Sequence, residues 1–314
     1  MTRSLATRRL SRRQLLGAAT AAVASATLGG AALTYGLEER PLAAPLAGAT
    51  GMAPPLSSAV PVPEAPLLVL TNPAADPDFG AYLIEILRTE GLATLQSAPL
   101  EQVGAAELAG FSVVVLAPGP VRHDQVALLR DYVARGGALV GIRPDAKLAG
   151  LFGVRLLGAA APGDYLHILA SLAELDGLDE TILQLHGPYD RLALDGARIV
   201  AHSGAGDPLV TLHRFGKGMT ALWAFDLARC VALIRQGNPA AAGQERDDLE
   251  GLRATDLFVD WIDLDRISIP QADEHQRLLA RMIEELAAAG PPLPRLWYFP
   301  GGAPALIVAT GDAH

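Results

Sequence analysis

The stretch Phe111–Pro144, FSVVVLAPGPVRHDQVALLRDYVARGGALVGIRP, decides the fold class of this chain. It begins with the continuous apolar run VVVL and ends with a second apolar run, ALVGI. The segment between them, RHDQVALLRDYVARGG, has a helical pattern and stops at a Gly pair. We therefore predict a strand, a helix and a strand. Because both strands are apolar on both faces, they indicate a parallel sheet covered by helices.

The same strand and helix unit recurs on both sides of this stretch. LLVLT (67–71) precedes a helical pattern at 76–91, LATLQS (92–97) precedes a second, and ALVGIRP precedes DAKLAGLFG. After Gly153, short apolar stretches separated by turn residues predict strands added at the edge of the sheet. Two of them flank Gly216-Lys217-Gly218, which predicts a hairpin turn. The fold class that we expect is α/β, a doubly wound and mostly parallel sheet with added edge strands.

Composition narrows the range of functions. Half of the 314 residues are apolar, 19% are charged and the formal net charge is −9. Residues 1–37 contain five Arg and no acid, so residues 38–314 hold 20 basic and 34 acidic residues, a net charge of −14. An acidic body argues against binding to nucleic acid, which requires clustered Lys and Arg. The single Cys230 has no partner for an internal disulfide.

The N-terminus resembles a twin-arginine export signal. SRRQLLG (11–17) is followed by an Ala- and Gly-rich apolar run, and together they form a basic region and a mildly apolar region over residues 1–37. The resemblance implies the Tat translocase as a partner, with a final location that is extracellular, periplasmic or membrane-anchored. The alternative is a plain membrane anchor, since residues 14–37 carry no charge. Residues 38–65 form a Pro- and Ala-rich linker. Contact with a membrane is expected only through this N-terminal segment.

Ligands of a doubly wound sheet bind at the carboxyl ends of its strands, so three loops matter most. They are residues 71–78, 117–123 and 142–147, and none contains a Gly-rich phosphate cradle. A later run, FDLARCVALIRQGNPAAAGQERD (225–247), is rich in polar residues that a core does not need. Its candidate binding residues are Asp226, Arg229, Arg235, Gln236 and Asn238. They line a polar cleft or a domain interface, or they belong to a solvated connector. Residues 231–290 as a whole are expected to form a polar connector and a final helix.

Residues 66–230 resemble the class I glutamine amidotransferase-like superfamily, specifically its ThuA-like and β-galactosidase trimerisation-type members, whose sheet is flavodoxin-like. The segments VVVLAPG, LLRDYVARGGALVGIRPDAKLAGLFGV and RFGKGMTALWAFDLA carry the resemblance. Amidotransferases need a Cys on a sharp strand-to-helix elbow, and here the equivalent turn reads GIRPDA. Cys230 lies in a helical pattern with apolar spacing, which favours a buried structural Cys. The domain is therefore expected to bind a ligand or a neighbouring domain, without amide hydrolysis.

The last segment, PALIVATGDAH (304–314), resembles the first motif of NodB-type polysaccharide deacetylases. The resemblance implies that residues 291–314 begin a deacetylase-like (β/α) barrel that is truncated here. Asp312 would be the catalytic base, and a divalent metal would be bound in the full-length protein. Ala313 stands where that family has a metal-binding Asp, so the metal role is lost or passes to His314. The alternative is an ordinary C-terminal strand.

Three readings of the function follow from these features. The first is the N-terminal part of an exported polysaccharide deacetylase-like protein whose amidotransferase-like domain is non-catalytic and whose partner is a polysaccharide or another glycan. In this reading the 314 residues alone are inactive and need no cofactor. The second is a non-enzymatic, envelope-associated module that binds a sugar or a protein. The third is a glutaminase-like hydrolase that uses Cys230. The seven His show no spacing typical of a metal site.

Overall fold

The computed structural model describes residues 66–158, 160–169, 182–247, 250–303 and 306–307. All of them belong to one compact unit, Ala59–His314. The predicted export signal and linker lie outside the described residues, as do Asp312 and His314. Among the helices in the described part of the chain, none is long and apolar enough to cross a membrane.

Five parallel strands form one half of the main sheet, in the order β2-β1-β3-β4-β11. They are β1 (Leu67–Thr71), β2 (Gln96–Pro99), β3 (Val113–Leu116), β4 (Ala138–Ile142) and β11 (Gly218–Trp223). The residues of β1, β3 and β4 are almost all buried, as expected for strands covered on both faces. The strand, helix and strand predicted within 111–144 are therefore confirmed.

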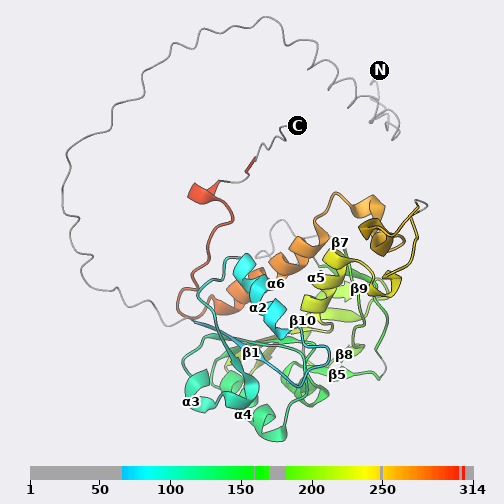
Figure 1. Cartoon of the computed structure of the whole chain (residues 1–314). Coiled ribbons are helices and arrows are strands. Elements are labelled where there is room, and N and C mark those ends of the chain that lie inside the picture. The colour runs from blue at the N-terminus through cyan, green and yellow to red at the C-terminus, as the bar shows by residue number, and fades with distance from the viewer. Residues whose placement is uncertain (1–65, 159, 170–181, 248–249, 304–305, 308–314) are drawn as a thin grey trace, which may run out of the picture. The chain divides into compact units, whose positions relative to one another are not determined.

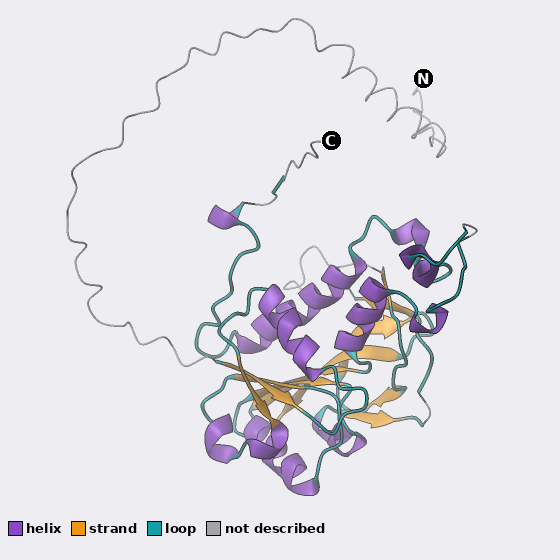
Figure 2. Ribbon diagram, in the orientation of Figure 1, coloured by secondary structure: helices purple, strands orange, loops and turns teal. Residues whose placement is uncertain are grey.

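Helices cover both faces of this parallel half (Figures 1 and 2). One face carries α2 (Gly80–Thr89), α5 (Leu227–Gln236) and α6 (Gln271–Ala287), which contact one another. The other face carries α3 (Ala105–Leu108), α4 (His123–Ala134) and the 3₁₀ helix η2 (Ala146–Leu151). The α/β, doubly wound class predicted from the sequence is thus confirmed.

The other half of the sheet is antiparallel and extends it in the order β11-β10-β9-β6-β7. Its strands are β6 (Tyr165–Ile168), β7 (Ile182–Gln184), β9 (Arg198–Ser203) and β10 (Pro208–Phe215). A separate pair joins β5 (Val154–Leu156) to β8 (Leu192–Leu194). The predicted hairpin connects β10 to β11, and its turn begins at Gly216, whose φ of 59° suits glycine. Edge strands are therefore present, and they make the sheet mixed.

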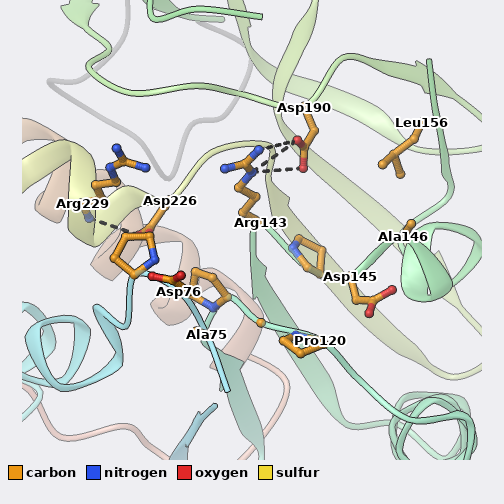
Figure 3. A pocket seen from close by; sticks show the side chains of 14 residues that line it. Ala75, Asp76, Pro120, Arg143, Asp145, Ala146, Leu156, Asp190, Asp226 and Arg229 are labelled. Carbon is orange, nitrogen blue, oxygen red and sulfur yellow. Dashed lines mark hydrogen bonds and ion pairs between the residues drawn. The ribbon is translucent and has the colours of Figure 1, made fainter. Parts of the chain in front are cut away.

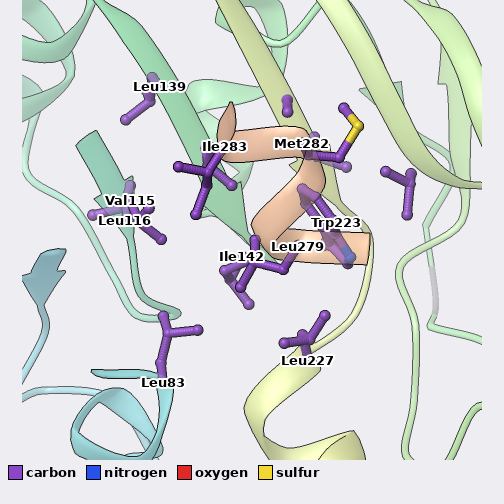
Figure 4. Close-up of a cluster of buried hydrophobic side chains, with 14 of the residues drawn as sticks. Leu83, Val115, Leu116, Leu139, Ile142, Trp223, Leu227, Leu279, Met282 and Ile283 are labelled. Atoms are coloured by element: carbon purple, nitrogen blue, oxygen red, sulfur yellow. The ribbon is translucent and has the colours of Figure 1, made fainter. Parts of the chain in front are cut away.

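The core occupies both faces of the sheet, and Figure 4 shows the part that lies between the sheet and the α2, α5 and α6 layer. Ile142, Trp223, Leu279 and Ile283 are each fully buried there. Sequence analysis placed α6 in a segment of connector and helix at 231–290, and the structure shows that α6 contacts β3, β4 and β11. Burying an apolar side chain of this size contributes about 2 kcal/mol, so α6 is a substantial part of the core.

Shorter elements fill the remaining described segments. They are the 3₁₀ helices η1 (Leu100–Gln102), η4 (Pro239–Ala241), η5 (Ala254–Phe258), η6 (Leu264–Arg266) and η7 (Pro300–Gly302). Of the predicted closing strand only Leu306 and Ile307 are described, and they have no regular secondary structure. Their side chains are 60% and 93% exposed, so the structure does not confirm a buried barrel strand at this point.

Candidate functional site

A cavity of about 420 Å³ lies where the parallel strands end, and we call it the edge cavity. Its lining comes from the loops that follow β1, β3, β4 and β11, and from the segment before β8 (Figure 3). The charged residues in this lining are Asp76, Arg143, Asp145, Asp190, Asp226 and Arg229. Sequence analysis identified three of these loops from the strand ends, and all three contribute to the cavity.

Two close contacts fix the loops around the edge cavity. Gly119 has a φ of +140°, and a Cβ atom on it would lie 2.4 Å from Nδ2 of Asn72, so only glycine permits this approach. Asn72, which directly follows β1, donates from Nδ2 to the carbonyl oxygen of Pro120 at 2.8 Å. The loops after β1 and β3 therefore hold each other in place before any ligand binds.

Arg143 occupies the sharp turn after β4. Its φ of 42° is unusual for a residue with a side chain and costs about 1 kcal/mol. Its backbone N–H donates to the carbonyl oxygen of Trp223 at 2.8 Å. The side chain meets Asp190, with 2.8 Å between Nη2 and Oδ1 and 3.2 Å between Nε and Oδ1. Both side chains are about one quarter exposed, so the pair faces the cavity and stays partly open to a ligand.

Asp190 reaches this position through an irregular segment that crosses the end of β11. Its backbone N–H donates to the carbonyl oxygen of Ala224 at 2.8 Å. The preceding residue, Tyr189, forms isolated bridges with Ala161 and Phe225. Asp190 was not predicted from the sequence, because no strong strand or helix pattern surrounds it and its partner lies 47 residues away. Asp76 lies in the predicted loop 71–78 but was not itself named as a site residue.

Asp226 and Arg229 stand at the start of α5. Asp226 is the N-cap residue, and its Oδ1 accepts from the backbone N–H of Arg229 at 3.1 Å. Asp226 is only 8% exposed, and burial raises its pKa, while that hydrogen bond and the charges of Arg229 and Arg143 act in the opposite direction. Within the described part of the chain, the Arg229 guanidinium makes no ion pair or hydrogen bond, so its donors remain available.

Asp145 links two of the loops. Burial alone would raise its pKa, but the net effect is a lowered pKa because hydrogen bonds stabilise the carboxylate. The backbone N–H groups of Lys147 and Val121 donate at 2.9 Å and 3.0 Å, and Nζ of Lys147 adds a third bond at 2.9 Å. Asp145 therefore stays ionised and holds the loops after β3 and β4 together beside the cavity.

The other three predicted binding residues do not line the edge cavity. Arg235 pairs with Asp273 of α6 at 2.7 Å, and Asn238 caps η4 by accepting from the backbone N–H of Ala240 at 3.0 Å. Gln236 is exposed at the end of α5. Of the five predicted residues, the structure therefore brings only Asp226 and Arg229 into the cavity.

Cys230 is fully buried in α5 and does not line the edge cavity. Burial raises the pKa of its thiol to about 12, so the nucleophilic thiolate is not formed near neutral pH. Its neighbour His275 is also fully buried, and burial lowers the pKa of the imidazole to about 4. Sγ of Cys230 lies 4.0 Å from Nε2 of His275, and that Nε2 donates to the carbonyl oxygen of Gln184 at 2.8 Å. The pair is part of the core.

The described lining of the edge cavity contains no Cys, Ser or Thr that could act as a nucleophile. Within the described ranges there is also no group of three or more His, Cys, Asp or Glu side chains that could hold a metal ion. The cavity combines carboxylate acceptors with guanidinium donors, and four Asp outnumber two Arg. This chemistry suits recognition of hydroxyl groups, which both donate and accept hydrogen bonds.

Comparison with known proteins gives weak similarities. No protein-family model matches the chain, and no curated protein matches it either. A β-galactosidase from Bacillus circulans sp. alkalophilus is 15% identical with a TM-score of 0.44, over 52% of this chain and 29% of that enzyme. The exo-β-1,4-mannosidase Op5Man5 from Opitutaceae bacterium strain TAV5 is 20% identical with a TM-score of 0.43, over 54% and 33% respectively.

A cytoplasmic protein from Salmonella typhimurium LT2 is 19% identical with a TM-score of 0.40, over 51% of this chain and 87% of that protein. The chain matches a third or less of the length of each of the two glycosidases. Since these TM-scores are below 0.5, the similarities carry no argument about the activity of this chain.

Proposed function

We propose that the α/β domain binds a sugar in the edge cavity and does not hydrolyse amides. The observation that carries this proposal is the pair that Asp190 forms with Arg143, which stands on the turn after β4, where an amidotransferase would need its Cys. An Arg and carboxylate pair that is already formed and partly open offers fixed donors and acceptors to a ligand. It offers no group that attacks an amide carbon.

The size and lining of the cavity support a small polyhydroxylated ligand. Its volume of about 420 Å³ lies in the range typical of small-molecule sites. Guanidinium groups of Arg143 and Arg229 donate to hydroxyl oxygens, and the carboxylates accept from hydroxyl hydrogens. Leu156 and several Pro residues in the lining provide apolar surface for the C–H face of a pyranose ring.

The wider role that we propose is in an exported, carbohydrate-active protein. Support comes from the sequence alone, through the twin-arginine resemblance of residues 1–37 and the deacetylase resemblance of residues 304–314. Asp312, as base, and His314, as metal ligand, remain predictions, and no metal chemistry is derived for the described domain. Within residues 1–314 we find a resemblance only to the first deacetylase motif, so we expect these 314 residues to release no acetate from acetylated chitooligosaccharides with added Zn²⁺. Release of acetate that is lost in Asp312→Ala would contradict the expectation that these residues are inactive.

Calorimetric titration of the full chain with common monosaccharides and disaccharides tests the binding proposal. We expect at least one of them to bind, and Arg143→Ala and Asp190→Asn to weaken that binding about tenfold or more, because each removes half of the preformed pair. Arg135→Ala is the matched control, since Arg135, the C-cap residue of α4, is 63% exposed and lies 3.6 Å from Asp131. Absence of binding for every sugar at millimolar concentration, or unchanged affinity in both cavity variants, would refute the proposal.

A further inference from the structure

Residues 291–303 follow α6, and we call this segment the strap; Arg295, Leu296 and Tyr298 fix it to the domain. In Figure 1 it leaves the end of α6 and runs beside α2. The backbone N–H of Leu296 donates to the carbonyl oxygen of Gly91 at 2.9 Å. Gly91 has a φ of +86°, and a Cβ atom there would lie 2.2 Å from the carbonyl oxygen of Leu296. This contact requires glycine, so Leu296 of the strap packs at a defined position just after the end of α2.

A buried ion pair anchors the strap. Arg295 donates from Nη2 to Oε2 of Glu90 at 2.8 Å and from Nε to the backbone carbonyl oxygen of Glu90 at 2.6 Å. The hydroxyl of Tyr298 donates to the same Oε2 at 2.6 Å. The side chains of Glu90 and Arg295 are only 5% and 14% exposed. A charge pair at this depth fixes the position of the residues next to it.

A groove of about 790 Å³ lies along the strap, and α6 forms its other wall. Glu274, Arg277, Arg281 and Glu284 are spaced by three or four residues, so they share one face of α6. They form ion pairs of 3.0 Å (Arg277–Glu274) and 3.4 Å (Arg281–Glu284), and Arg295 adds a bond of 3.0 Å to Glu284. Every guanidinium in this wall therefore has a carboxylate beside it, which leaves little net charge.

The strap contributes aromatic side chains that are fixed but exposed. Trp297 is 60% exposed and Tyr298 is 44% exposed, although both line the groove. The indole Nε1–H of Trp297 donates to the carbonyl oxygen of Ala303 at 3.1 Å, and the Tyr298 ring lies over the Arg295 guanidinium at 5.4 Å. Tyr298 is thus oriented by its bond to Glu90 and Trp297 by a bond within the strap, and both rings keep exposed apolar faces.

We propose that this strap groove binds an oligosaccharide. The face of Trp297 would cover the C–H face of a pyranose ring, and the Arg and Glu side chains of α6 would exchange hydrogen bonds with the hydroxyl groups. Nucleic acid is a poor fit, since the guanidinium groups are already neutralised by carboxylates. The volume is larger than that of the edge cavity and accommodates a chain of several sugar units.

The strap groove is separate from the edge cavity and does not depend on the function proposed for it. Its α2 residues, Thr89 and Glu90, lie at the end of that helix, whereas Asp76 of the edge cavity precedes its start. Variants of one site should therefore leave binding at the other unchanged. This allows the two proposals to fail separately.

Tryptophan fluorescence of the full chain provides the test. Trp297 is 60% exposed, Trp223 is fully buried, and Trp261 is partly buried with its ring stacked on His186, so acrylamide should quench mainly Trp297. Titration with cellohexaose, chitohexaose and mannohexaose should protect this emission for at least one sugar. Trp297→Ala should weaken binding of that sugar, measured by calorimetry, about tenfold or more, and Trp297→Phe should retain most of it because a ring face remains.

Leu252→Ala and Arg143→Ala are the controls. Leu252 is 64% exposed outside the groove, and Arg143 belongs to the edge cavity, so neither change should alter hexasaccharide binding. The proposal is overturned if no hexasaccharide protects the emission at millimolar concentration. It is also overturned if Trp297→Ala binds as well as the unaltered chain. Protection that appears without sugar as protein concentration rises would mean that a second copy covers the groove, which likewise contradicts the proposal.

Discussion

The edge cavity and the strap groove each contain an Arg and carboxylate pair, and the two pairs differ in depth. Arg143 and Asp190 are 28% and 22% exposed, whereas Arg295 and Glu90 are 14% and 5% exposed. The deeper pair also uses a backbone carbonyl and a tyrosine hydroxyl, so its hydrogen-bonding capacity is largely consumed. The depth of burial therefore distinguishes the Arg295–Glu90 pair, which anchors the strap, from the Arg143–Asp190 pair, which can still bind a ligand.

The largest expected effect comes from a change that should damage both regions together. Leu279 of α6 is fully buried, and Leu279→Ala should lower the free energy of unfolding by about 3 to 5 kcal/mol because it leaves a void in the shared core. Urea unfolding followed by circular dichroism measures this. The exposed Leu252→Ala should change stability by less than about 0.5 kcal/mol. Equal values for the two variants would mean that α6 is not part of the core.

A smaller effect should separate the two regions. Glu90→Ala removes the acceptor of both Arg295 and Tyr298, and we expect a cost of about 2 to 3 kcal/mol, since Glu284 still pairs with Arg295. The Leu296 amide should lose protection from hydrogen exchange, while the Arg143 amide, bonded to Trp223, should keep it.

Glu101→Ala is the control for Glu90→Ala, because Glu101 is exposed and should leave both amides protected. Retained protection of the Leu296 amide in Glu90→Ala would show that the buried pair does not anchor the strap.

The smallest effect concerns pH at the edge cavity. Burial raises the pKa of Asp226, so the folded protein favours its protonated form. The free energy of unfolding therefore falls as pH rises from the ordinary aspartate pKa through the raised one, because the buried carboxyl then ionises. Asn at this position stays neutral and still caps α5. Unfolding in urea should therefore show Asp226→Asn close to the unaltered chain at about pH 4 and more stable at about pH 7. If Asp226→Asn were less stable than the unaltered chain at about pH 7, the pKa of Asp226 would not be raised in the folded protein.

The sequence predicted β1, β3, β4 and β11 well, but it predicted a strand at 92–97 where β2 is Gln96–Pro99, and it predicted the antiparallel half only in outline. β1, β3 and β4 are apolar runs with Gly, Pro or Asn within three residues of each end, and Gly216 and Gly218 flank Lys217 where β10 turns into β11, so their limits are marked by local chemistry. β6 and β8 are only three or four residues long and their pairing depends on distant partners. The order of these strands cannot be read from a local pattern.

The candidate site was predicted in part for a similar reason. Asp226 and Arg229 are three residues apart at the start of α5 and meet the same cavity. Arg235 and Asn238 are close to them in sequence, but a helix of ten residues is about 15 Å long and carries them away from it. The Arg143–Asp190 pair was missed because the register of an irregular segment, and not a motif, brings Asp190 to the turn.

Amide chemical-shift mapping tests most directly whether the edge cavity binds a sugar. The isotope-labelled full chain would be titrated with the monosaccharide or disaccharide that binds best in calorimetry. We expect the largest shifts at Arg143, Asp145, Asp190 and Arg229, whose side chains line the cavity, and small shifts at Leu296 and Trp297 of the strap. Shifts confined to the strap, or no shifts at these four amides with any sugar, would contradict the account.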